Sequence, residues 1–379
     1  MRRCRKMSSS ANWNCWARLN SDFVPAPGIL RARAGRRAPF LPLFVLLVFL
    51  VLTDKERVNA AVTSENMPNT RSAEWQFGDR AFKWLTLAMA LVIFALIVLI
   101  GCELALGARP AMHQFGWRFL IRTDWDPVNE KFGALPFIFG TLVSSAIALL
   151  IAVPISIATA VYLTELAPLW LRQPLIMFIE LLAAVPSVIL GLWGIFVMVP
   201  WLRDHLFPWL QKCFGFLPLF KGPIYGVSML AGGIIVAIMI IPIITSVSRE
   251  ILRSVPGLQR EAAYALGATR WEVTRIAVLS YAKKGLFGAV ILGLGRALGE
   301  TMAVTMVIGN SPQISASWFA PGYTLASVMA NEFNEATGTL YTSALIELGL
   351  VLLGVTVLVN IFAQLLLKTF AGPSVRPQH

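Results

Sequence analysis

Four charged residues stand inside long apolar stretches of the sequence: Glu180, Arg296, Glu300 and Glu347. A charge at the centre of a membrane-spanning helix costs at least about 2.5–3.5 kcal/mol, so each residue needs a reason if these stretches cross a membrane. Arg296 and Glu300 are spaced i, i+4 and would share one helical face. A guanidinium presents planar, paired donors that match an oxyanion. The two residues could also form a self-neutralising ion pair that fixes helix packing, and both interpretations stay open.

The composition identifies an integral membrane protein. Of 379 residues, 57% are hydrophobic and 14% are charged, and the mean hydropathy is +0.69. Soluble domains carry about 25% charged residues, and a soluble chain could not hide this apolar excess from water. These values exclude a soluble enzyme, a disordered protein and a disulfide scaffold.

Spanning a bilayer takes about 20 apolar residues in a helix. The sequence predicts an all-α fold with six such spans, at 85–106, 134–163, 174–200, 226–247, 285–309 and 343–367. Arg296 then falls about 11 residues into the fifth span, close to the midplane of the membrane. Gly295 and Gly299 form a small-xxx-small pair around it, which predicts close helix packing there.

Residues 1–66 form a basic leader that precedes the spans. Its first 40 residues hold nine Lys or Arg against one acid, and a 13-residue apolar run follows at Phe40–Leu52. Three interpretations stay open: a signal-like sequence, a mitochondrial transit peptide, or an over-extended reading frame whose true start is Met67. The remaining domain prediction is an N-terminal segment at 67–84, the six-span unit at 85–367 and a tail at 368–379.

The distribution of basic residues predicts the orientation. Segment 248–284 contains seven Lys or Arg, whereas loop 310–342 contains none. Loop 107–133 contains four, beside three acidic residues. We therefore expect segment 248–284 and both ends of the six-span unit to be cytoplasmic. The basic balance suits anionic lipid rather than nucleic acid.

Segment 248–284 has the pattern of a helix, a break and a second helix. Glu261-Ala262-Ala263 begins a helix-forming stretch, and Gly267 is a natural stop because glycine adopts the left-handed conformation freely. Thr269 with Glu272 forms a capping-box pattern before the second helix. On these local signals alone the segment could be an ordinary surface helical hairpin.

The Glu261-Ala262-Ala263 and Gly267 pattern resembles the EAA loop of ATP-binding-cassette import permeases. In that family the loop docks into a cleft on the cytoplasmic ATPase and couples it to the spans. Two later positions depart from the family pattern, where this chain has Ala277 and Ser280. The first half of the motif is intact, and it lies between the fourth and fifth predicted spans, as in the family.

Further motifs narrow the resemblance to the C-type permease subunits of phosphate-specific importers; they lie at 123–127, 132–136, 180–187 and 293–303. The resemblance covers about residues 75–370. It implies the type I importer permease fold, a location in the bacterial inner membrane and a heteromeric complex. The implied partners are a paralogous second permease, two ATPase subunits and a periplasmic phosphate-binding protein.

The intramembrane charges suggest a substrate pathway, and the resemblance implies a set of ATPase-coupling residues. The expected substrate pathway consists of Arg296, Glu300, Thr301, Glu180 and Glu347, and the expected ATPase-coupling residues are Glu261, Ala262, Ala263 and Gly267. Glu300 would accept a hydrogen bond from the proton that phosphate keeps at neutral pH and would repel fully ionised sulfate. Glu180 and Glu347 could instead pair with basic residues of the second permease.

We expect no catalytic residue and no cofactor in this chain. A Walker-A pattern is absent from the sequence, so ATP and Mg²⁺ would be used by the partner ATPase. The four cysteines and three histidines are scattered without metal-type spacing, so we expect no metal site. The alternatives are a permease for another oxyanion (sulfate or molybdate), an ion-coupled secondary transporter, and an assembly or sensing subunit.

Overall fold

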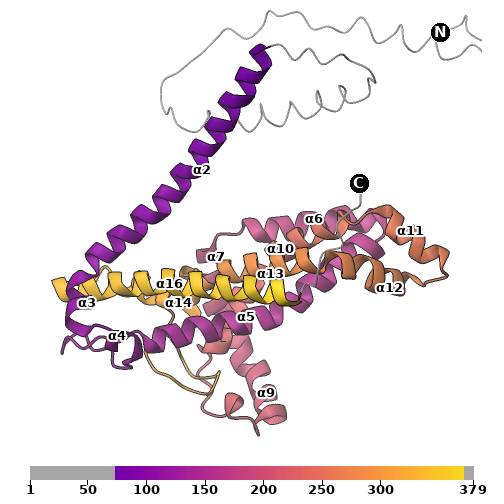
Figure 1. Cartoon of the computed structure of the whole chain (residues 1–379). Coiled ribbons are helices and arrows are strands. Elements are labelled where there is room, and N and C mark those ends of the chain that lie inside the picture. Colours follow the sequence, from indigo (N-terminus) through magenta and orange to yellow (C-terminus); the bar gives the residue numbers. More distant parts are fainter. Residues whose placement is uncertain (1–72, 371–379) are drawn as a thin grey trace, which may run out of the picture. The chain divides into compact units, whose positions relative to one another are not determined.

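The computed structural model describes residues 73–370 (Figure 1). The leader at 1–66 and nearly all of the predicted tail at 368–379 lie outside the described residues. The chain divides into residues 1–83 and 84–379. The described part of the first unit is the start of helix α2, which begins at Ala73, inside the expected N-terminal segment. The second unit holds the structure that follows.

The described residues form helices and connecting turns, with an isolated β-bridge between Asp126 and Lys131. The longer helices are α2 (Ala73–Gly107), α5 (Leu135–Val161), α6 (Leu169–Ala184), α10 (Met229–Arg253), α13 (Ser280–Leu298) and α16 (Thr339–Phe370). The shorter helices are α3 (Arg109–Phe115), α4 (Arg118–Ile121), α7 (Ser187–Trp193), α8 (Val199–Trp201), α9 (Phe207–Phe214), α11 (Gly257–Ala265), α12 (Arg270–Glu272), α14 (Met302–Val307) and α15 (Leu325–Glu332). Wide π-helical turns η1 (Tyr162–Leu166), η2 (Gly194–Met198), η3 (Leu202–Leu206) and η5 (Val273–Leu279) extend several helices, and η4 (Pro218–Phe220) is a 3₁₀ turn.

Six helical stretches of this region are long and apolar enough to cross a membrane, which confirms the all-α, six-span prediction. They are Ala81–Gly107, Leu135–Leu166, Ser187–Phe214, Met229–Arg253, Arg270–Leu298 and Thr339–Leu366. The first, second, fourth and sixth lie close to their predicted positions. In the first, every side chain from 81 to 100 is exposed.

The third span was predicted at 174–200, and the structure places it at Ser187–Phe214. The prediction was wrong because the apolar run 174–200 contains two helices. Val185 is extended (ψ 125°) before Pro186, as proline requires of its predecessor, and α6 therefore ends at Ala184. The new helix then continues past Pro200 through π turns, despite the polar residues at 203–205.

The fifth span was predicted at 285–309, and the structure places it at Arg270–Leu298. Residues 299–301 interrupt the helix, and α14 is a separate short helix after the break. Glycine at 299 is among the weakest helix formers. The prediction overlooked this break because the residues on both sides of it are apolar. Arg296 is consequently in the last turn of α13 rather than near the middle of a span.

Helices α5 and α10 form the centre of the bundle (Figure 1). A Cβ at Gly233 of α10 would collide with Ile147 of α5, and the Ser156 hydroxyl donates to the Ile241 carbonyl at 3.2 Å. Because 147 pairs with 233 and 156 with 241, the two helices run side by side in the same direction. The absence of a side chain at Gly233 permits this close approach.

Different glycines from those predicted pack helix α13. A Cβ at Gly293 would lie 2.6 Å from Ile244 of α10, and a Cβ at Gly285 would lie 2.6 Å from Ile251. A Cβ at Gly295 would have no neighbour within 4 Å, and one at Gly299 would meet only the Gly295 carbonyl at 3.8 Å. Within this chain the prediction of packing at 295 and 299 is therefore wrong. At about 100° per residue, position 295 faces away from the side that position 293 presents to α10.

The end of the bundle opposite α11 is held by an aromatic cluster. The Trp125 ring lies 5.0 Å from Phe132, whose ring stacks on Tyr341 at 5.4 Å. Glu332 Oε2 accepts hydrogen bonds from Trp125 Nε1 (2.8 Å) and from the Tyr341 hydroxyl (2.7 Å). In the turn beside Trp125, the Asn129 side-chain amide holds the pKa of Asp126 below its usual value. The motif residues at 123–136 thus anchor this loop to α15 and α16.

Candidate functional site

The predicted Arg296–Glu300 contact is present at the break between α13 and α14. Arg296 Nη2 lies 3.3 Å from Glu300 Oε2. The Arg296 side chain is 49% exposed, whereas that of Glu300 is 4% exposed. Thr301 lies in the same break, where its hydroxyl donates to the Gly299 carbonyl at 3.3 Å. The break therefore presents one cation outward and holds a carboxylate behind it.

Arg296 belongs to a face of α13 that is open in this chain. Leu292 and Gly288 are exposed on the same face, about one and two turns earlier, and a Cβ at Gly295 would have no neighbour within 4 Å. Gly293, which packs against α10, lies about 60° around the helix from Arg296, so Arg296 stands at the edge of this open face. An anion or a second chain can consequently reach the guanidinium, which can offer paired donors to an oxyanion.

Glu180 lies apart from this break, in contact with another helix. Its Oε1 is 3.9 Å from Arg249 Nη2, a long contact, and its side chain is 62% exposed. Arg249 also binds the neighbouring Glu250 at 2.8 Å. Arg249 was not among the predicted site residues, although it is one of the seven basic residues of segment 248–284. The long-range contact with Glu180 had no sequence signal.

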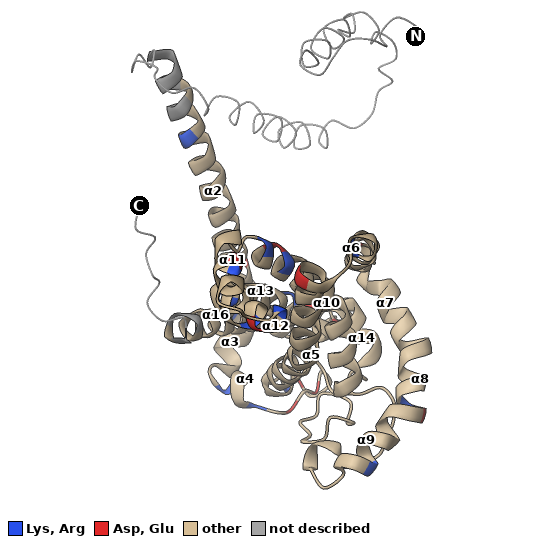
Figure 2. Cartoon of the chain, turned by 90° about the vertical axis from the view of Figure 1, so that its right-hand side faces the viewer, with Lys and Arg blue, Asp and Glu red and all other residues tan. Residues whose placement is uncertain are grey.

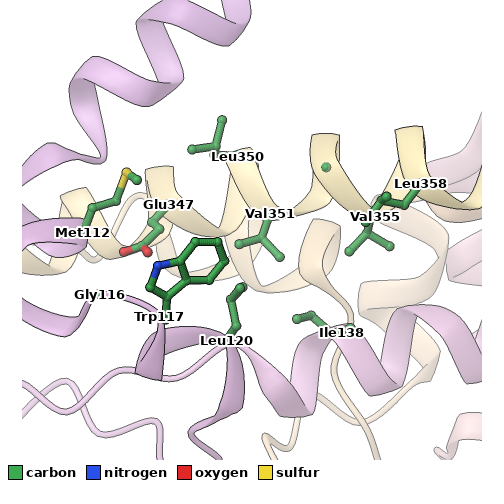
Figure 3. A pocket seen from close by; sticks show the side chains of 11 residues that line it. Met112, Gly116, Trp117, Leu120, Ile138, Glu347, Leu350, Val351, Val355 and Leu358 are labelled. Atoms are coloured by element: carbon green, nitrogen blue, oxygen red, sulfur yellow. The ribbon is translucent and has the colours of Figure 1, made fainter.

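Glu347 lines a different feature, a cavity of about 650 Å³ along α16. Its lining is almost wholly apolar, and Figure 3 shows the Glu347 carboxylate beside the Trp117 indole at one end, with Val351 and Val355 further along the helix. Glu347 is only 6% exposed, and its Oε2 has no hydrogen-bond partner among the described residues. The five predicted pathway residues therefore divide among three places, and the recorded contacts join Arg296 only to Glu300.

The local helix, stop and capping-box pattern predicted within segment 248–284 is present in the structure. Helix α11 contains Glu261, Ala262 and Ala263, and Gly267 follows it with φ +82°. The Thr269 capping box is complete, with both reciprocal hydrogen bonds to Glu272. The predicted loop bounds of 248–284 were too wide, because α10 continues to Arg253 and α12 begins at Arg270. The two polar ends of segment 248–284 are therefore extensions of the neighbouring helices.

Helix α11 has no buried residue, and its surroundings expose large apolar side chains as well as charges. Leu258, Tyr264, Leu266 and Trp271 are exposed. Figure 2 shows acidic and basic residues gathered around α11, α12 and the neighbouring end of α10. A surface that combines apolar side chains with charges is suited to binding another protein.

An ion pair that the sequence did not predict lies at this end of the bundle. Arg260 Nη2 lies 3.0 Å from Glu165 Oε1, and the two side chains are 24% and 16% exposed. The residues are 95 positions apart, and Glu165 lies just beyond the predicted second span. A search for acids at the ends of spans could have identified Glu165, but not its partner. Within residues 73–370, no group of three or more His, Cys, Asp or Glu side chains could hold a metal ion.

The six spans and the exposed helix between the fourth and fifth define a multi-pass membrane protein. Residues 152–371 match the family model of the binding-protein-dependent transport system inner membrane component, and the chain belongs to that family. The phosphate transport system permease protein PstC of Mesorhizobium japonicum is 45% identical over 317 residues, which cover 81% of this chain and 97% of that protein. The protein of the same name from Haemophilus influenzae is 49% identical over 293 residues, covering 76% and 93%.

A solved structure supports the fold. It is a bacterial alginate ABC transporter in complex with an alginate pentasaccharide-bound periplasmic protein, and one of its chains is similar to this one with a TM-score of 0.52. The match covers 79% of this chain and 99% of that chain at 16% sequence identity. The described helices thus have the type I importer permease fold.

Proposed function

We propose that this chain is the membrane-spanning permease subunit of an ATP-driven importer of inorganic phosphate. The observation that carries the proposal is the similarity to phosphate transport permeases, which spans 97% and 93% of the length of two of them. The six spans and the exposed helix α11 agree with this role.

The anion would pass Arg296. The open face of α13 that carries Arg296 would meet a paralogous second permease subunit, with the pathway between the two chains. Thr301 lies beside Arg296 in the helix break and would also face the anion. Glu180 contacts Arg249, which favours a role outside the phosphate path. Glu347 lines the apolar cavity, which favours the same conclusion for that residue.

ATP would be hydrolysed by two ATPase subunits that dock on α11 and its exposed neighbours. Glu261, Ala262, Ala263 and Gly267 would form the centre of that contact. ATP and Mg²⁺ would be bound by those subunits, and this chain would bind no cofactor. A periplasmic phosphate-binding protein would deliver the anion to the opposite end of the bundle.

The excess of Lys and Arg near α11 supports a cytoplasmic position for that end. Both ends of the six-span unit would then be cytoplasmic, and the aromatic cluster around Trp125 would face the periplasm. The membrane would be the bacterial inner membrane.

The experiment is uptake of radiolabelled phosphate by cells whose only copy of this permease carries Arg296→Ala. Loss of a charge-assisted contact with the anion should lower uptake roughly tenfold or more. The amount of protein in the membrane is measured in parallel. Arg203→Ala is the matched control, because Arg203 is 52% exposed and, within residues 73–370, forms its ion pair with the adjacent Asp204. Normal uptake by Arg296→Ala would remove this residue from the proposed pathway.

A further inference from the structure

Arg260, the residue before Glu261, joins three segments of the bundle. Its Nη2 lies 3.0 Å from Glu165 Oε1 in η1 and donates to the Leu252 carbonyl, also at 3.0 Å. Its Nη1 donates to the Val255 carbonyl at 2.8 Å. Leu252 lies in the last turn of α10, and Val255 follows that helix. One guanidinium thus connects the ends of the second and fourth spans to helix α11.

The chemistry of these contacts favours arginine. The last carbonyls of a helix have no partner within the helix and carry partial negative charge. Arg260 binds two carbonyls at the end of α10 and the Glu165 carboxylate at the same time, which the planar fork of a guanidinium permits. Both side chains are mostly shielded, so water weakens this pair less than it weakens a pair on the surface.

Helix α11 lies against η5, but none of its residues is buried. Among the described residues, Arg260 makes all of the side-chain hydrogen bonds of α11. The segments that Arg260 binds are themselves firmly packed. An apolar cluster at this end of the bundle joins α5, α10, η5 and α13; its buried members are Ala160, Leu252, Val255, Val278, Ala282 and Leu286.

A continuous series of packed helices leads from this cluster toward Arg296. Helix α5 packs along α10 where Gly233 meets Ile147. Helix α10 in turn packs against α13 where Ile244 meets Gly293. Arg296 follows Gly293 by three residues, on the face of α13 that is open. A displacement of Arg260 therefore has a route of close contacts to the guanidinium of Arg296, although such a route requires a test of coupling.

We propose that the Arg260–Glu165 pair is the link through which movement of α11 displaces the second span. Arg260 is then a positioning residue for transport, distinct from the surface on which the ATPase docks. This inference rests on the proposed function, because it assigns to the pair a part in coupling ATP hydrolysis to import.

The test uses the whole complex, with the ATPase subunits and the binding protein, reconstituted in vesicles. Phosphate import and ATP hydrolysis are measured on the same sample. Glu165→Gln keeps the size of the side chain and removes its charge. We expect hydrolysis to continue and the phosphate imported per ATP to fall about tenfold or more, as the loss of a charged hydrogen bond would give. Glu250→Gln is the matched control, because this exposed carboxylate at the same end pairs within its own helix and with no residue of α11.

A double-mutant cycle separates a link from two independent effects. If the pair acts as one unit, Arg260→Gln combined with Glu165→Gln should be no worse than Arg260→Gln alone. Additive losses would overturn the inference, as would an unchanged import ratio in Glu165→Gln. Equal losses of hydrolysis and import, or loss of the ATPase subunits from the purified complex, would show a merely structural role and would also overturn it.

The failure of the proposed function gives a different result. If the wild-type complex imports another oxyanion instead of phosphate, the proposed substrate is wrong, and the import ratio for that anion tests the link in the same way. If the wild-type complex hydrolyses ATP without importing any oxyanion, both proposals fail together.

Discussion

Arg296 and Glu300 remain in contact at 3.3 Å although the helix that carries Arg296 ends at Leu298, between them. The i, i+4 spacing predicts this contact in a continuous helix. In the structure the chain bends at Gly299, and the bend buries the carboxylate while the guanidinium stays half exposed. The break therefore gives the two charges different surroundings, which a straight helix would not do.

Glu300→Gln tests whether the carboxylate selects the anion. Phosphate at neutral pH carries a hydroxyl group that can donate a hydrogen bond to a carboxylate, whereas sulfate has no such donor. We expect the variant to import phosphate less well and to lose discrimination, so that sulfate competes with radiolabelled phosphate roughly tenfold better. Unchanged phosphate uptake together with unchanged exclusion of sulfate would show that Glu300 has no such role.

Gly267→Ala tests the backbone of segment 254–269, which lies between α10 and α12. Gly267 has φ +82°, where an L side chain costs roughly 1–2 kcal/mol, and a Cβ there would have no neighbour within 4 Å. We expect faster proteolysis at 254–269 and reduced phosphate uptake, with a milder effect for Gly267→Asn because asparagine tolerates this conformation better. Gly101→Ala, in helix α2 and also without a neighbour, should change neither result. Equal behaviour of the alanine variants at 267 and 101 would argue against a conformational requirement.

Gly140→Ala tests a close approach at the other end of α5. A Cβ at Gly140 would overlap the backbone carbonyl of Tyr323, and the loop that carries it would have to move. We expect a loss of about 1–3 kcal/mol of stability, measured as a lower thermal transition of the solubilised chain. The same Gly101→Ala variant serves as the reference, and an unaltered transition in Gly140→Ala would contradict the close contact.

Glu347→Gln tests the unpaired carboxylate in the cavity. A buried charge without a partner is destabilising, so the neutral amide should raise the thermal transition by about 2–4 °C, equivalent to roughly 1 kcal/mol. Glu335→Gln, which changes an exposed carboxylate, should leave the transition unchanged. Phosphate uptake should also be unchanged. A loss of uptake at normal membrane levels would return Glu347 to the substrate pathway.

Segment 254–269 shows why the end of one helix and the start of the next could be predicted from sequence. The stop at Gly267 and the capping box at Thr269 depend on residues at most a few positions apart, and both are present in the structure. The predicted bounds of the third and fifth spans were wrong because they were read from the length of an apolar run and not from such local signals. An apolar run measures only whether residues prefer lipid to water, so it does not reveal the breaks at Pro186 and Gly299.

The sequence by itself determined that this protein is a six-span membrane protein with a helix-forming segment between the fourth and fifth spans. Apolar length and local helix signals suffice for that, because they act within one segment. Only the tertiary structure decided which glycines of α13 pack against α10, that Glu347 lines an apolar cavity, and that Arg260 binds Glu165. These features join residues from distant segments, and such contacts depend on how the helices rotate and pack against one another.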